Sequence, residues 1–292
     1  MNLDHFGMDT ITLAGPLEAK LRAIGAAGFT QVMLNANDLA GHPGGPQAAI
    51  EVVRSSGLRV TGFQVLRDFE GLSGHLHAYK VDIAKAMLEM CHALGSRVLL
   101  ACSSTSSHAT GDFEALKKDL QKLAMLAVPY GIRVAYEALS WGRHVNEYHQ
   151  SWDIVAEADR ANLGIAIDSF HILAMRTGPE RLEEIVPGKV FLVQLADFMW
   201  REIRSREERI DTARHFRVFP GEGVHSAELA ELVRTLDRLG YRGDYSFEVF
   251  NDDYTQLPVE VVAERARRSV KWLTDKVSRR SLPLRKASTL RG

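Results

Sequence analysis

Apolar residues along the chain fall into two kinds of segment. Short runs rich in branched and aromatic residues predict buried strands, because such runs are typical of a sheet that is covered on both faces. These runs occupy residues 6–13, 31–35, 59–66, 97–102, 132–139, 163–168, 190–196 and 245–250. Longer segments between them place apolar residues three and four positions apart, which is the spacing of a helix with one buried face.

The segment between the third and fourth strands illustrates the helical pattern. Its apolar residues predict a single face that packs on the sheet, made by Tyr79, Ile83, Ala86, Met87, Met90 and Leu94. Gly95 follows this face and suits the left-handed conformation that ends many helices. Gly28, Gly131 and Gly240 stand at the matching point of other segments, so the unit of strand and helix repeats.

Eight repeats of this unit predict an α/β protein with a closed (β/α)8 barrel, a TIM barrel, which forms one catalytic domain over residues 1–275. A doubly wound sheet is the alternative, but residues 41–45 lack the glycine pattern of a nucleotide-binding loop. Residues 200–217 are too charged for a core strand and predict a loop or short helix over the barrel mouth. Residues 276–292 contain six basic and no acidic residues, which predicts a flexible tail.

Composition narrows the classes of partner. The chain has 292 residues, 46% of them hydrophobic, and a net charge of −1, so no overall positive field favours nucleic acid. Its two cysteines, Cys91 and Cys102, are too few for a disulfide framework and favour a reducing compartment. The start lacks a signal-peptide pattern and no apolar run is long enough to span a bilayer, so we expect a cytoplasmic protein without a membrane partner.

Polar side chains interrupt four successive predicted strands, the fifth to the eighth. Glu137, Asp168, Gln194 and Glu248 each lie toward the carboxyl end of an apolar run. Taken singly, each carboxylate has an ordinary structural explanation as a helix cap or an arginine partner. Closure of the barrel would direct all four side chains into one volume at its carboxyl-terminal end, where these barrels carry their active sites.

Three carboxylates in one partly dry cavity repel one another, and a bound cation relieves that repulsion. The amide oxygen of Gln194 would add a fourth hard ligand without adding charge. A set made only of oxygens favours one divalent cation, Mg²⁺ or Mn²⁺, with Co²⁺ as a substitute. The alternative is a group of structural ion pairs.

Arginines and histidines near these strands are candidates for substrate binding and proton transfer. Arg67 follows the third strand, while Arg214 and Arg217 lie between the seventh and eighth, and a guanidinium matches a carboxylate or phosphate. His171 and His144 follow the sixth and fifth strands, and histidine is a common group for proton transfer. Each arginine also has a structural interpretation as part of a surface ion pair, and each histidine as a hydrogen-bonded structural group. The aromatic residues near them either line a pocket or pack in the core; they are Trp141, Phe170 and Phe198.

Longer blocks carry a family resemblance. The chain resembles bacterial 3-dehydroshikimate dehydratases, within the xylose isomerase-like superfamily of TIM barrels, from about residue 6 to 275. The resemblance rests on RDFEG at 67–71, YEALSWGRHVN at 136–146, DSFH at 168–171, QLAD at 194–197, RHFRVFPGEG at 214–223, GYRG at 240–243 and FEVFND at 247–252. Many sugar epimerases of the superfamily have a histidine where this chain has Gln194. Some of these dehydratases continue into a domain that resembles hydroxyphenylpyruvate dioxygenase, and here only the basic tail follows.

The resemblance implies a site and a reaction. It implies four metal ligands, which are Glu137, Asp168, Gln194 and Glu248. It also implies that Arg67 and His171 lie beside the substrate, with Arg214 and Arg217 nearby. The implied reaction is the loss of water from 3-dehydroshikimate to give protocatechuate, with His171, His144, Glu137 and Glu248 as candidates for acid and base. The expected partners are a small carboxylate substrate and further copies of the chain.

Other activities remain open at this point. The first alternative is a ketose or sugar-phosphate isomerase or epimerase that works through a metal-stabilised enediolate, with Glu137 and Glu248 as bases. A repair endonuclease on the same scaffold would require more metal-binding histidines and a basic groove. A barrel that binds a ligand without turning it over is the third alternative.

Overall fold

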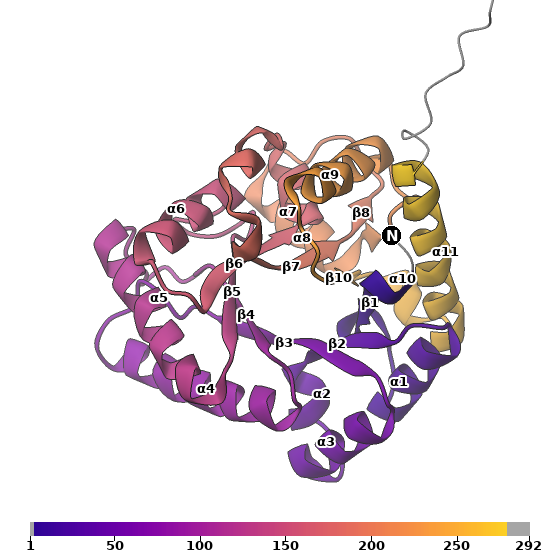
Figure 1. The fold of residues 1–292 in the computed structure, drawn as a ribbon, viewed down its shortest axis with the longest axis horizontal. Coiled ribbons are helices and arrows are strands. Elements are labelled where there is room, and N and C mark those ends of the chain that lie inside the picture. The colour runs from indigo at the N-terminus through magenta and orange to yellow at the C-terminus, as the bar shows by residue number, and fades with distance from the viewer. Residues whose placement is uncertain (1–2, 279–292) are drawn as a thin grey trace, which may run out of the picture.

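The computed structural model describes residues 3–278 of the chain. Within this range, eight parallel strands close into a barrel in the order β1-β2-β3-β4-β5-β6-β7-β10, and Figure 1 shows helices surrounding the ring of strands. The barrel strands are β1 Phe6–Asp9, β2 Gln31–Asn35, β3 Arg59–Arg67, β4 Val98–Cys102, β5 Arg133–Glu137, β6 Leu163–Asp168, β7 Val190–Leu195 and β10 Tyr245–Phe247. The predicted (β/α)8 barrel is confirmed.

Four predicted strands end earlier than their apolar runs. The first ends at Asp9, because the Asp9 carboxylate accepts a hydrogen bond from the amide of Ile11 and caps a short 3-10 helix, Thr10–Thr12. The fifth ends at Glu137, the seventh at Leu195 and the eighth at Phe247. The apolar residues that directly follow are still buried, namely Ala138, Leu139, Ala196 and Val249. Apolar pattern alone does not mark the end of a strand where the connecting loop is also buried.

The outer layer is made of helices that cover the strands on all sides. They are α1 Leu17–Ala26, α2 Ala36–Ala40, α3 Gly45–Ser55, α4 Gly74–Ala93, α5 Phe113–Ala127, α6 Tyr148–Ala158, α7 Ser169–Met175, α8 Arg206–His215, α9 Ser226–Leu239, α10 Asp252–Thr255 and α11 Val259–Ser278. The last helix packs against α1 and α9 and so joins the two ends of the ring. It extends three residues past the predicted end of the barrel at residue 275, and residues 279–292 of the predicted tail lie outside the described range.

The buried face of α4 differs from the predicted one. Tyr79 is 62% exposed and Ala86 is also exposed, so the predicted face is wrong in part. The residues that are buried are Val81, Ala84, Met87, Leu88 and Cys91. Two apolar faces overlap along this helix, and its contacts with β3 and β4 select the one that contains Cys91.

The charged segment 200–217 contains the helix α8, Arg206–His215. A short helix is one of the two conformations predicted for this segment, the other being a loop. Arg206 and Arg209 donate hydrogen bonds to the backbone carbonyls of Trp141 and Ser140, which follow β5. The helix is preceded by β8 Asp197–Phe198 and followed by β9 Arg217–Val218, which pair antiparallel. Helix α8 therefore lies at the carboxyl-terminal end of the barrel, the mouth.

Within residues 3–278, no helix combines the length and the apolar composition needed to cross a bilayer.

Candidate active site

The four predicted ligand residues come from strands that are neighbours in the closed barrel. Glu137 and Asp168 are the last residues of β5 and β6, Gln194 is the fifth residue of β7, and Glu248 directly follows β10. Asp168 and Gln194 are register partners across β6 and β7. All four side chains are buried. The structure thus brings the predicted residues to one end of the barrel.

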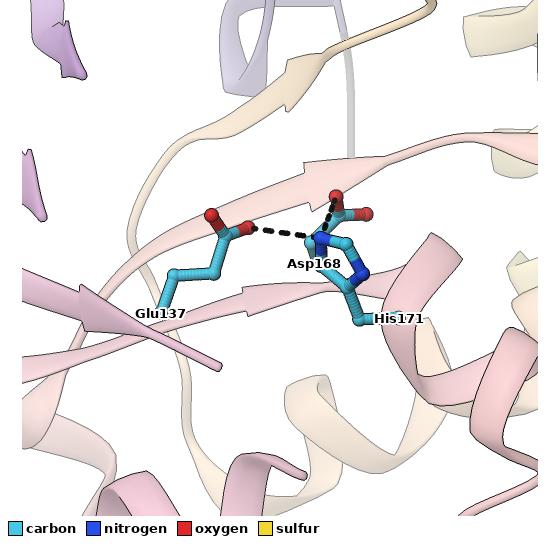
Figure 2. A group of neighbouring side chains, drawn as sticks. All are labelled: Glu137, Asp168 and His171. Atoms are coloured by element: carbon cyan, nitrogen blue, oxygen red, sulfur yellow. Dashed lines mark ion pairs between the residues drawn. The ribbon is translucent and has the colours of Figure 1, made fainter. Parts of the chain in front are cut away.

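Figure 2 shows that Glu137 and Asp168 face the imidazole of His171. The His171 Nε2 atom lies 3.6 Å from Asp168 Oδ2 and 3.9 Å from Glu137 Oε1. One ligand atom from each of these three residues lies within 4.8 Å of the other two, which is close enough for one ion to touch all three. The local sequence explains this grouping, because Asp168 is the N-cap of α7 and its Oδ1 accepts a hydrogen bond from Phe170 N. The helix therefore begins directly after the strand, and His171 lies in its first turn.

Arg217 joins two of the carboxylates. Its Nη1 atom donates to Asp168 Oδ2 at 2.8 Å and to Glu248 Oε2 at 2.9 Å, and the side chain is only 2% exposed. Its Nε donates to the carbonyl of Ala213, and the guanidinium lies over the ring of Phe170. The family resemblance places Arg217 near the substrate, and in the structure this arginine pairs with two buried carboxylates.

The carboxylates carry more negative charge than Arg217 neutralises. Burial, followed by the charges of Asp168 and Glu248, raises the pKa of Glu137 to about 8. Burial also raises the pKa of Asp168 and of Glu248, and Arg217 opposes that rise in both. Without a second cation, the buried negative charge of the cluster thus favours the protonated form of these carboxyl groups.

Several buried atoms of the cluster have no hydrogen-bond partner among the described residues. They are Glu137 Oε1 and both amide atoms of Gln194, whose side chain is fully buried. A buried polar atom without a partner costs about 1–3 kcal/mol, so native proteins rarely leave such atoms unused. Atoms of this kind beside two further carboxylates have the chemistry of a site for a hard divalent cation.

The proton on His171 can be placed from its neighbours. The backbone amide of Ser140 donates to Nδ1, with the Ser140 hydroxyl also 3.0 Å away, so the neutral ring carries its proton on Nε2. Burial lowers the pKa of His171 well below its ordinary value, and the charges of Arg217 and Arg67 lower it further. Trp141 and Phe170 pack edge to face against the imidazole. The ring is therefore neutral and presents an N–H to the carboxylates.

The remaining predicted residues lie outside this cluster. Arg67 is exposed at the end of β3 and forms no ion pair within residues 3–278, yet its charge contributes to the low pKa of His171 after burial and Arg217. Arg214 is exposed in the last turn of α8. The His144 ring is exposed and its Nε2 lies 2.9 Å from the carbonyl of Ala109, so the structure keeps His144 in contact with a neighbouring loop instead of Glu137.

The structure adds three polar residues that the sequence patterns did not single out. Cys102, at the end of β4, places its thiol 2.8 Å from Glu137 Oε2. The side-chain amide of Gln64 donates to the buried carboxylate of Asp9. The same side chain is also hydrogen-bonded to Glu248. All three lie in strands whose residues are mostly apolar, and only the register of the closed barrel identifies them as neighbours of the site.

Glu70 is a buried carboxyl group three residues after Arg67, the last residue of β3. Its Oε1 accepts hydrogen bonds from Ser104 N and Tyr136 Oη, and burial raises its pKa from 4.5 to about 7. Because the folded pKa lies above the unfolded one, the stability from protonated Glu70 is complete below pH 4.5. It is lost as the pH rises toward 7, by roughly 3 kcal/mol in all.

Glu70→Gln should therefore stabilise the protein at high pH alone. We expect equal unfolding free energies for the variant and the parent at pH 4.5, and a gain of roughly 1–3 kcal/mol for the variant at pH 8. Urea unfolding at a series of pH values measures this difference. The exposed Glu114→Gln variant is the control, and a gain for Glu70→Gln that does not change with pH would contradict the assignment.

Known proteins resemble this chain over nearly its full length. A 3-dehydroshikimate dehydratase of Pseudomonas aeruginosa is 38% identical over 267 residues, which cover 91% of this chain and 41% of that protein. The chain thus spans less than half the length of this relative. A 3-dehydroshikimate dehydratase of Neurospora crassa is 27% identical over 263 residues, with 76% of this chain and 73% of that protein covered.

A solved structure shows the same relationship. It is a fusion of a xylose isomerase-like TIM barrel with a 4-hydroxyphenylpyruvate dioxygenase, and it superposes with a TM-score of 0.88 at 36% identity. The match covers 95% of this chain and 44% of the fusion protein. A sequence profile described as xylose isomerase-like TIM barrel matches residues 19–276. The chain therefore belongs to the xylose isomerase-like TIM barrel family.

Proposed function

We propose that the barrel catalyses the divalent-metal-dependent loss of water from 3-dehydroshikimate to give protocatechuate. One observation carries this proposal, namely the 38% identity to a 3-dehydroshikimate dehydratase along 91% of the chain. The Neurospora relative supports it, since this chain covers 73% of the length of that dehydratase. The carboxylate cluster at the mouth supplies the chemistry that such an elimination requires.

The residues of the cluster fit a divalent cation. Glu137, Asp168, Gln194 and Glu248 would hold it through oxygens, and the unpartnered Glu137 Oε1 and Gln194 amide support this choice. Oxygen ligands favour Mg²⁺ or Mn²⁺, and Co²⁺ is an accepted substitute. When bound, the ion supplies Lewis acidity toward the substrate ketone, which makes the neighbouring carbon-bound proton easier to remove.

The side chains around the cluster have separate tasks in this proposal. Arg67, exposed and without an ion pair in the described chain, binds the substrate carboxylate at the rim. His171 donates a hydrogen bond from Nε2 to the departing hydroxyl, because its Nδ1 is occupied by Ser140 N. The hydroxyl leaves as water with the proton that is taken from carbon. Removal of the carbon-bound proton falls to a carboxylate of the cluster. Arg214 and His144 are not given a role, since neither contacts the cluster.

The test is an assay of the purified protein with 3-dehydroshikimate. We expect aromatic product, followed by its ultraviolet absorbance, with Mn²⁺ or Mg²⁺ and none after chelation. A protein that binds metal and makes no product with any divalent ion would contradict the dehydratase proposal. Conversion of ketopentoses or ketohexoses in its place would favour the isomerase or epimerase alternative.

A further inference from the structure

We propose that the thiol of Cys102 is a positioning group for Glu137, which it holds so that one carboxylate oxygen is left for the metal ion. This inference rests on the metal site of the proposed function. It assigns a role to a residue that is neither a predicted ligand nor a contact of the substrate. Three observations support it: the strand register, the contact itself and the unequal environment of the two Glu137 oxygens.

The register places the two side chains together. Cys102 and Glu137 are direct partners in the parallel pair β4 and β5, and each is the last residue of its strand. Side chains of register partners leave neighbouring strands on the same face. Both residues are buried, so their proximity follows from the barrel backbone and does not depend on an exposed, mobile side chain.

The contact gives the two oxygens of Glu137 different surroundings. Oε2 accepts the hydrogen bond of the Cys102 thiol at 2.8 Å. Oε1 is buried without a hydrogen-bond partner and lies 3.9 Å from His171 Nε2. The donor fixes the rotation of the carboxylate about its last bond, and the free oxygen is the one that points toward the ion site. Hydrogen bonds to ligating carboxylates act in this way in other metal sites, where their loss weakens metal binding.

The chain offers a matched control for the thiol. Cys91 is the other cysteine, it is also buried, and its thiol donates to the carbonyls of Ser96 and Val98, away from the cluster. Cys91→Ala removes the same atom from a buried position that does not contact the carboxylates. A general effect of a lost buried sulfur on folding would therefore appear in both variants, and an effect on the site only in Cys102→Ala.

The experiment measures Mn²⁺ affinity in the absence of substrate, by the electron paramagnetic resonance signal of free Mn²⁺. We expect Cys102→Ala to weaken Mn²⁺ binding by roughly 10-fold to 100-fold, while Cys91→Ala binds as the parent does. Cys102→Ser keeps a donor of similar size and should stay within about threefold of the parent. Circular dichroism melting of each metal-free variant confirms that it is folded.

The contrary outcomes are distinct. Parent-like Mn²⁺ affinity in Cys102→Ala, or equal losses in Cys102→Ser and Cys102→Ala, would overturn the hydrogen-bond role. A Co²⁺ complex of the parent with a near-ultraviolet thiolate charge-transfer band, absent in Cys102→Ala, would make the sulfur a ligand and would also overturn it. No Mn²⁺ binding by the parent would remove the metal site and this inference together. Metal binding without dehydratase activity would contradict the proposed reaction alone.

Discussion

Arg217→Met is expected to destabilise the metal-free protein by about 3–5 kcal/mol, because removing one partner of a buried ion pair leaves uncompensated charge. Arg217 donates to both Asp168 and Glu248, so its loss leaves two buried carboxylates facing each other. Methionine retains much of the side-chain volume between Phe170 and Phe250, which limits the loss of packing. Urea unfolding of the protein after chelation measures the difference.

The same variant distinguishes a metal site from a set of structural ion pairs. A divalent cation that binds the carboxylates replaces part of the lost positive charge, so saturating Mn²⁺ should stabilise Arg217→Met by more than it stabilises the parent. Arg214→Met is the control, since Arg214 is exposed on α8 three residues earlier. A loss below about 1 kcal/mol in Arg217→Met would contradict the importance of this pairing, because that is the range of surface ion pairs.

Glu137→Gln is expected to lower kcat for dehydration by roughly 1,000-fold, because the Lewis acidity of a correctly held ion is worth several kcal/mol in the transition state. The change retains the shape of the side chain and removes one negative charge from the cluster. Mn²⁺ affinity should fall in the same variant. Steady-state rates with 3-dehydroshikimate and an Mn²⁺ titration give both quantities.

The control for this variant is Glu157→Gln, which makes the same substitution at an exposed position of α6. It should retain the rate and the affinity of the parent. A Glu137→Gln protein with an unchanged rate and unchanged metal dependence would exclude Glu137 from the ligand set.

Much of the site could be predicted because its residues break a pattern. Glu137, Asp168 and Gln194 stand out as polar side chains in apolar strands, and a barrel with parallel strands brings such positions to one end. The fold followed from the repeat of strand and helix. Only the ends of strands such as β1 and β5 were overestimated, since buried loops continue their apolar runs.

The contacts that the sequence did not predict are those between distant segments. Arg217 reaches Asp168 across 49 positions of the chain and Glu248 across 31. Cys102 passes for an ordinary apolar residue in its strand until the register places it beside Glu137. His144 looked like a catalytic candidate from spacing alone, and its hydrogen bond to Ala109 depends on the path of two loops that periodicity does not describe.

The two oxygens of the Asp168 carboxylate make different contacts. Oδ1 caps the first turn of α7 while Oδ2 faces Arg217 and His171, and His171 belongs to that same turn. A substitution that shifts this carboxylate is therefore expected to shift the start of α7, and the imidazole of His171 with it.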